Sequence, residues 1–155
     1  MYIHLITAGQ RMPGWVQTGF EEYTRRMPVE CRLNLIEVPL IKRNKDGDIP
    51  RIIQEEGVRL LKAVPKNSRI GVLDRSGKNI STPQLANTLE QWLSAGQDMA
   101  LLIGGPDGLS AECLQRAEFK WSLSALTFPH PLVRIMVAEQ LYRAMMILKG
   151  HPYHK

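Results

Sequence analysis

The chain has 155 residues, 44% of them hydrophobic, which is enough for one domain with its own core. Its formal net charge of +5 at pH 7 favours an anionic partner such as a nucleic acid. No apolar run reaches the roughly 20 residues that cross a membrane, and the first ten residues lack the features of a signal peptide. Cys31 and Cys113 have neither disulfide nor zinc spacing, so we expect two buried thiols in a cytoplasmic protein.

Strand and helix periodicities alternate along the whole chain. In chain order the pattern predicts a strand at 2–9, a helix at 14–27, a strand at 31–38, a helix at 49–64, a strand at 69–74, a helix at 81–96, a strand at 99–105, a short helix at 110–119, a strand at 121–127 and a last helix at 131–150. This alternation predicts one α/β domain over residues 1–155, a three-layer sandwich with a mostly parallel sheet.

Ligands of open α/β sheets bind beyond the carboxyl ends of the strands. That rule indicates three loops, which follow Leu73, follow Gly104 and surround Thr127. The second loop lies in the stretch LLIGGPDGLS (101–110), whose glycines do not have the spacing of a dinucleotide fingerprint. No phosphate-binding P-loop occurs elsewhere in the chain, so a phosphate cradle of either standard kind is excluded.

The stretch GGPDG (104–108) is typical of a tight turn, which accounts for Pro106 and Gly108. It leaves Gly104 and Gly105 at the end of a buried strand, where glycine often permits close approach by a ligand. We therefore expect these two glycines to contact a ligand, with turn formation alone as the alternative.

The residues show neither a metal site nor a nucleophile. His151 and His154 are the only close pair of histidines, and no Cys, Asp or Glu completes a metal set beside them. The nucleophile-elbow spacing of hydrolases is absent. His130, between two prolines, is interpreted as structural, and Arg143 is placed four residues after Glu139, a spacing that suits a helical ion pair.

Several separated stretches resemble one family. They are GQRMPGWVQTGFEEYTRR (9–26), LLIGGPDGLS (101–110), WSLSALTFPHPLVR (121–134), EQLYRA (139–144) and the terminal HPYHK (151–155). Together they resemble the small SPOUT-superfamily methyltransferases that act on ring nitrogen 3 of a pseudouridine in bacterial 23S rRNA. The resemblance spans nearly the whole chain, with Asp107 where the family more often has Glu.

The resemblance implies a fold that periodicity could not predict. In this family the C-terminal part forms a trefoil knot, in which the chain from about Leu123 to Pro129 threads through an earlier loop. Such knots are rare exceptions to the usual topology rules. The family also implies a homodimer, so the helix at 131–150, apolar on most sides, would pack on a partner subunit as well as on its own sheet.

The resemblance also implies S-adenosylmethionine as methyl donor and no metal. By matching position, the donor site would comprise Leu73, Gly104, Gly105, Leu123, Ser124, Ala125, Leu126, Thr127 and Phe128. His154 is the first candidate for assisting proton loss from the substrate nitrogen, followed by Tyr153 and Arg134. The expected contacts to the rRNA backbone are Arg25, Arg26, Lys42, Arg43 and Lys45.

The expected substrate is 23S rRNA in the assembled 70S ribosome. Two alternatives stay open. One is a SPOUT methyltransferase that acts on another RNA, such as tRNA. The other is a non-catalytic RNA-binding α/β module, which would bind RNA and transfer nothing.

Overall fold

The structure is a computed structural model that describes all residues, 1–155. Five parallel strands form one sheet in the order β2-β1-β4-β3-β5. They are β1 (Tyr2–Ala8), β2 (Arg32–Val38), β3 (Arg69–Asn79), β4 (Met99–Ile103) and β5 (Phe119–Ser122). The helices are α1 (Gly14–Thr24), α2 (Ile49–Lys62), α3 (Thr82–Ala95), α4 (Ala111–Arg116) and α5 (His130–Leu148), followed by the 3₁₀ turn η1 (Pro152–His154).

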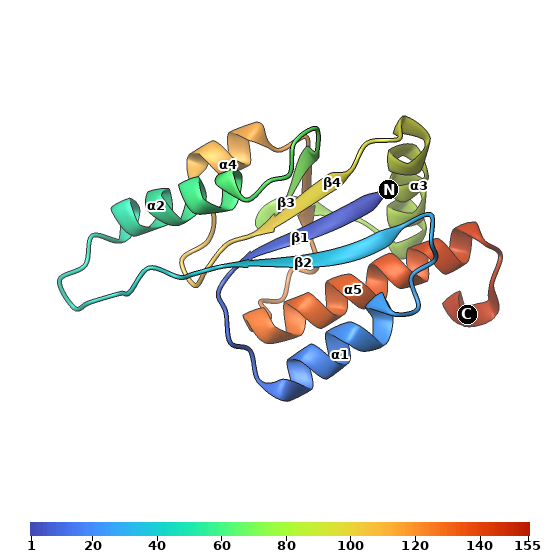
Figure 1. Cartoon of the computed structure of the whole chain (residues 1–155), viewed down its shortest axis with the longest axis horizontal. Helices are drawn as coiled ribbons and strands as arrows, with labels where there is room; N and C mark the ends of the chain where they lie inside the picture. The colour runs from blue at the N-terminus through green and yellow to red at the C-terminus, as the bar shows by residue number, and fades with distance from the viewer.

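Two helix layers cover the sheet, with α1, α3 and α5 on one face and α2 and α4 on the other (Figure 1). Alternate residues of the central strands serve the two faces, as period 2 requires. Leu5 and Leu101 belong to the larger core under α1, α3 and α5, whereas Ile6 and Leu102 belong to the smaller core under α2 and α4. The predicted α/β sandwich with a parallel sheet is confirmed.

Local capping chemistry sets the helix starts. The Ser81 hydroxyl accepts from the Gln84 N–H, and the Gln84 side chain accepts from the Ser81 N–H, which forms a capping box before α3. Single side-chain caps start two other helices: the Asp48 carboxylate accepts from the Arg51 N–H before α2, and the Ser110 hydroxyl accepts from the Cys113 N–H before α4. Gly96 ends α3 in the left-handed conformation that glycine adopts without strain.

Several predicted boundaries were wrong, and three of them have a clear structural reason. The strand predicted at 121–127 ends at Ser122, because local bonds replace the sheet ladder: the Ser122 hydroxyl donates to the Ser124 carbonyl, and the Leu126 N–H donates to the Ser124 hydroxyl. The strand predicted at 69–74 continues to Asn79, since its polar end pairs with β5 beyond a register shift. The helix predicted at 110–119 is confined to α4, because Phe119 already belongs to β5.

No helix has both the length and the apolar character that a membrane-crossing segment needs. Both cysteines are buried and free, and burial raises the pKa of Cys31 to about 11, so its thiol is protonated at neutral pH.

Candidate active site

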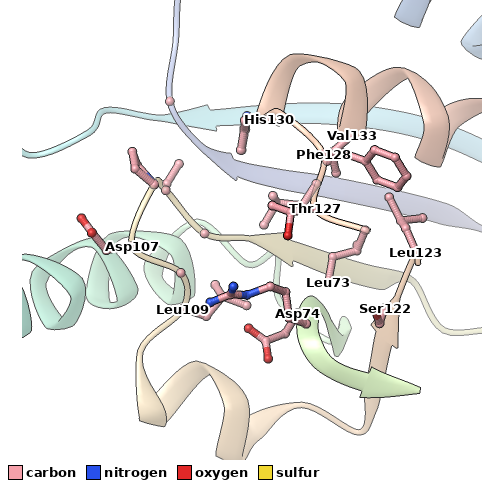
Figure 2. Close-up of a pocket in the computed structure, with 18 of the residues that line it drawn as sticks. Leu73, Asp74, Asp107, Leu109, Ser122, Leu123, Thr127, Phe128, His130 and Val133 are labelled. Atoms are coloured by element: carbon pink, nitrogen blue, oxygen red, sulfur yellow. The ribbon is translucent and has the colours of Figure 1, made fainter. Parts of the chain in front are cut away.

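A cavity of about 740 Å³ opens at the carboxyl edge of the sheet (Figure 2). Its walls are the loops after β1, β2, β4 and β5, the middle of β3 and the start of α5. The lining residues are Ala8, Gly9, Gln10, Met12, Leu40, Leu73, Asp74, Arg75, Ile103–Leu109, Ser122–Ser124, Leu126–Phe128, His130 and Val133. The volume is within the range of small-molecule and cofactor sites.

The turn after β4 requires both of its outer glycines. A Cβ on Gly104 would lie 2.5 Å from the Gly108 carbonyl oxygen, and Gly108 itself has φ +88°. Gly105 is different, because its Cβ would meet the Leu40 side chain at 2.8 Å rather than another part of the turn. Turn formation therefore explains the absence of a side chain at Gly104, which the sequence had left unexplained.

The loop between β5 and α5 forms the opposite wall. Leu123 and Phe128 are half-buried, and Figure 2 places them at the end of the cavity away from Asp107. Leu126 is 71% exposed although it lines the cavity. Of the nine predicted donor-site residues, all but Ala125 line the cavity, so three segments distant in sequence meet around it.

Asp74 is a lining residue that the sequence analysis did not name. It directly follows Leu73, and its carboxylate accepts from the N–H and the hydroxyl of Ser76. These local bonds hold a negative charge at the cavity wall, where it would favour a positively charged ligand. Its place at the end of a predicted strand was the signal that could have found it.

His130, interpreted as structural, also lines the cavity. Neither ring nitrogen has a hydrogen-bond partner, and both are buried. Burial and, to a lesser extent, the nearby Arg134 guanidinium lower the pKa of His130 to about 4. The imidazole is therefore neutral at pH 7.

Arg134 does not line this cavity. Its side chain is 1% exposed and donates to the Glu37 carboxylate at 2.7 Å and to the Gly9 carbonyl at 2.8 Å. These bonds attach α5 to the carboxyl ends of β1 and β2. Arg134 does line a second, smaller cavity of about 310 Å³ beside α1, which also includes Glu37.

The other two predicted catalytic residues lie on the C-terminal tail, which contributes nothing to the cavity wall. The Tyr153 hydroxyl donates to Glu139 at 3.2 Å, and the Arg143 guanidinium lies 4.8 Å from the centre of the Tyr153 ring. Burial and the Glu139 charge raise the pKa of Tyr153 to about 12, so it is a neutral phenol. His154 contacts the His151 carbonyl at 2.5 Å through Nδ1.

The predicted Glu139–Arg143 ion pair is confirmed, with Nη2 of Arg143 at 2.6 Å from Oε1 of Glu139. In Figure 1 the C-terminus lies at the far end of α5 from the start of that helix. The cavity and the tail are therefore separate within one chain.

The predicted RNA contacts differ in their surroundings. Arg25 and Arg26 are exposed on the end of α1 and both pair with Glu22. Lys42 and Lys45 are exposed on the loop between β2 and α2. Arg43, between them, is only 21% exposed and is bound to Glu56 and Asp107. No group of three or more His, Cys, Asp or Glu side chains is arranged to hold a metal ion.

The geometry of a cavity formed by the loops at the carboxyl ends of parallel strands defines a small-ligand-binding α/β protein. A family model described as "Predicted SPOUT methyltransferase" matches residues 1–154. The chain belongs to this SPOUT methyltransferase family, which confirms the resemblance. It is 56% identical over 155 residues to ribosomal RNA large subunit methyltransferase H of Methylococcus capsulatus (strain ATCC 33009 / NCIMB 11132 / Bath), with 100% of each chain covered.

The protein of the same name from Thioalkalivibrio sulfidiphilus (strain HL-EbGR7) is 52% identical, over 100% of this chain and 99% of that one. Among solved structures, a probable methylase family protein from Haemophilus influenzae Rd KW20 matches with a TM-score of 0.59 and 12% identity, over 99% of this chain and 70% of that one. The SpoU methyltransferase AviRb from Streptomyces viridochromogenes, in complex with the cofactor AdoMet, has a TM-score of 0.50 and 13% identity, over 94% of this chain and 58% of that one. At these identities the two structures support the fold alone.

Proposed function

We propose that this protein transfers a methyl group from S-adenosylmethionine to ring nitrogen 3 of a pseudouridine in 23S rRNA, within the assembled 70S ribosome in the cytoplasm. The observation that carries the proposal is the cavity at the carboxyl edge, because its walls unite eight of the nine residues expected to bind the donor. The names of the full-length relatives support rRNA as the substrate.

The residues present fit this donor. The walls offer apolar side chains such as Leu73 and Phe128 for an adenine ring, and backbone groups of the Gly104–Gly108 turn for its polar edge. Asp74 supplies a negative charge suited to a cationic donor, and the donor carries no phosphate that would need a P-loop. When bound, S-adenosylmethionine supplies an activated methyl group, so the protein's own tasks are alignment and proton management.

His154 is the residue we assign to proton management at the substrate nitrogen. Tyr153 is a neutral phenol and would donate a hydrogen bond rather than accept a proton. Arg134, enclosed by Glu37 and the Gly9 carbonyl, would act by fixing the start of α5 beside the cavity rather than by contacting the base.

In a homodimer, the C-terminal tail of one subunit could lie beside the cavity of the other subunit. The Tyr153 hydroxyl donates a hydrogen bond to Glu139. Glu139 is nine residues after His130 on α5, which is about 13 Å further along the helix axis. The tail of one chain therefore does not reach its own cavity, whereas the tail of a second copy could. Exposed apolar side chains on both α1 and α5, Trp15 and Leu132, offer surface for a second copy to cover.

We also propose that the C-terminal part of the chain forms a trefoil knot. The irregular segment from Leu123 to Pro129 runs between β5 and α5 and lines the cavity over most of its length. A trefoil knot would hold this segment against the Gly104–Gly108 turn without help from a ligand. It would also explain why an apolar stretch leaves the sheet instead of extending β5.

The experiment that tests the function is transfer of tritiated methyl groups from S-adenosylmethionine to RNA from cells that lack this protein. Assembled 70S ribosomes, free 23S rRNA and bulk tRNA are assayed in parallel. Label on ribosomes alone, mapped to a pseudouridine, is the expected result. Label on tRNA would overturn the substrate, and binding of RNA without any transfer would favour the non-catalytic module.

A further inference from the structure

Arg43 joins three segments of the chain at the edge of the cavity. Its Nη1 and Nη2 donate to the two carboxylate oxygens of Glu56 on α2, both at 2.8 Å. Its Nε donates to the Asp107 carboxylate at 2.8 Å, and Nη1 also donates to the Ile41 carbonyl at 2.9 Å. All of the guanidinium's nitrogens are therefore engaged within the protein.

The Glu56 side of this arrangement is rigid. Glu56 is 2% exposed, and a buried carboxylate is stable only when paired and hydrogen-bonded. Besides Arg43, it accepts from the Ile41 N–H at 3.0 Å. The planar fork of arginine matches a carboxylate in this two-point manner, which lysine cannot reproduce. Glu56 thus fixes both the position and the orientation of Arg43.

The Asp107 side belongs to the cavity. Asp107 lies in the turn after β4, and its side chain is 34% exposed (Figure 2). The backbone of the same turn packs on the same group, since a Cβ on Gly105 would lie 2.8 Å from Leu40 and 3.2 Å from Oε1 of Glu56. Arg43 and its neighbours therefore contact the cavity turn through both a side chain and the backbone.

We infer that Arg43 is a positioning residue that, anchored by Glu56, holds the Gly104–Gly108 turn through Asp107 in the geometry that binds the methyl donor. It also connects this turn to the basic loop on which Lys42 and Lys45 are exposed. The inference rests on the proposed function and replaces the expectation that Arg43 contacts an RNA phosphate, because four of its five N–H donors are already used within the protein.

Two conservative variants distinguish positioning from phosphate contact. Arg43→Lys keeps the charge that an RNA phosphate would recognise and loses the fork. Asp107→Asn keeps the shape of the turn residue and loses the ionic partner, while the buried Arg43–Glu56 pair stays intact. Arg51→Lys is the matched control, because Arg51 is an exposed arginine on α2 whose Nε pairs with Glu55 at 3.0 Å.

The experiment measures S-adenosylmethionine affinity by calorimetry without RNA, and 70S ribosome binding at two salt concentrations. We expect Arg43→Lys and Asp107→Asn each to weaken donor binding about tenfold, a typical coupling between linked groups. The double variant should bind the donor no more weakly than Arg43→Lys alone, because in this assignment Asp107 acts on the turn only through Arg43. Asp107→Glu should retain donor affinity, and ribosome binding should stay as in the wild type.

Each other outcome counts against the assignment. Arg43→Lys with unchanged donor affinity, or additive effects in the double variant, would overturn it. Weaker ribosome binding with unchanged donor affinity would make Arg43 a phosphate contact after all. If Arg43→Lys unfolds, Asp107→Asn decides alone, because it leaves the buried pair in place. A wild-type protein that binds no donor would instead overturn the proposed function.

Discussion

The two ends of helix α5 carry different halves of the proposed site. At its start, His130 and Val133 line a cavity whose other walls are glycine-rich backbone and apolar side chains. Beyond its end, the tail carries Tyr153 and His154 folded against the helix, and neither of the two cavities described above includes either residue. The start of α5 therefore contributes a cavity but no group assigned to proton management, and the tail contributes His154 but no part of that cavity.

This difference predicts that donor binding and proton management can be impaired separately in this protein. His130, the histidine at the cavity, is kept neutral by burial, with a pKa of about 4. The groups assigned to proton management in the proposed function are on the tail, which would meet the cavity of the second chain in the proposed dimer. Substitutions at the start of α5 and the cavity should therefore weaken donor binding, whereas substitutions on the tail should lower turnover.

The largest effect is expected at the tail. His154→Ala should lower turnover on 70S ribosomes by about 10²- to 10⁴-fold, the usual contribution of a positioned acid–base group. Donor affinity should remain within about twofold, because His154 does not line the cavity. Single-turnover methylation and calorimetry measure the two quantities, and Lys155→Ala is the neighbouring control. Unchanged turnover would remove His154 from the mechanism.

The cavity end should show the opposite pattern. Gly104→Ala places a Cβ against the Gly108 carbonyl oxygen, and overpacking of this kind costs about 1–3 kcal/mol. We expect donor binding to weaken by about 10- to 100-fold in calorimetry. Gly14→Ala is the matched control, since nothing lies within 4 Å of a Cβ there. Equal donor affinity in both variants would mean that the turn does not shape the site.

A mixture of the two defective proteins tests whether the halves come from different chains. Gly104→Ala and His154→Ala chains, unfolded and refolded together, should regain about a quarter of wild-type activity. Half of the dimers would then be mixed, and one site in each would have an intact cavity and an intact tail. Each variant refolded alone is the control. Without recovery in the mixture, the tail must act within its own chain.

The neutral state of His130 should appear in the pH dependence of stability. Its pKa of about 4 in the folded protein lies below the ordinary 6.5, so between these values the unfolded chain binds a proton that the folded chain excludes. Stability is therefore lost as the pH falls from 6.5 towards 4. His130→Phe removes this contribution, and its Tm should drop by about 4–7 °C less than that of the wild type between pH 7 and 5. Equal drops would mean that His130 titrates normally.

The smallest effect is expected on the basic loop near the cavity. Lys42→Ala and Lys45→Ala should each weaken 70S binding by a few-fold and lower the slope of log K against log salt by about one unit. Filter binding between 50 and 200 mM salt, a range that exposes such slopes, measures both. Lys66→Ala, an exposed lysine beyond the other end of α2, is the control. Identical slopes in all three variants would exclude this loop from the RNA contact.

Much of the fold could be predicted because its strands are short and apolar and its helices carry clear caps. Failures occurred where tertiary contacts overruled the local pattern. The apolar run after Trp121 suggested a longer strand, yet it lines a cavity, and an apolar side chain is equally suited to either place. The polar end of β3 suggested a loop, yet it pairs with β5 as far as Asn79.

The sequence by itself determined the alternation of strands and helices, the family, and eight residues that meet at the cavity, because these depend on local period, capping and matched motifs. Only the tertiary structure decided that Arg43 is bound to Glu56 and Asp107, and that Arg134 is buried against Glu37. It also decided that His154 does not line the cavity of its own chain. The physical reason is that an ionisable side chain takes its role from its partners, and partners far apart in sequence are set by packing.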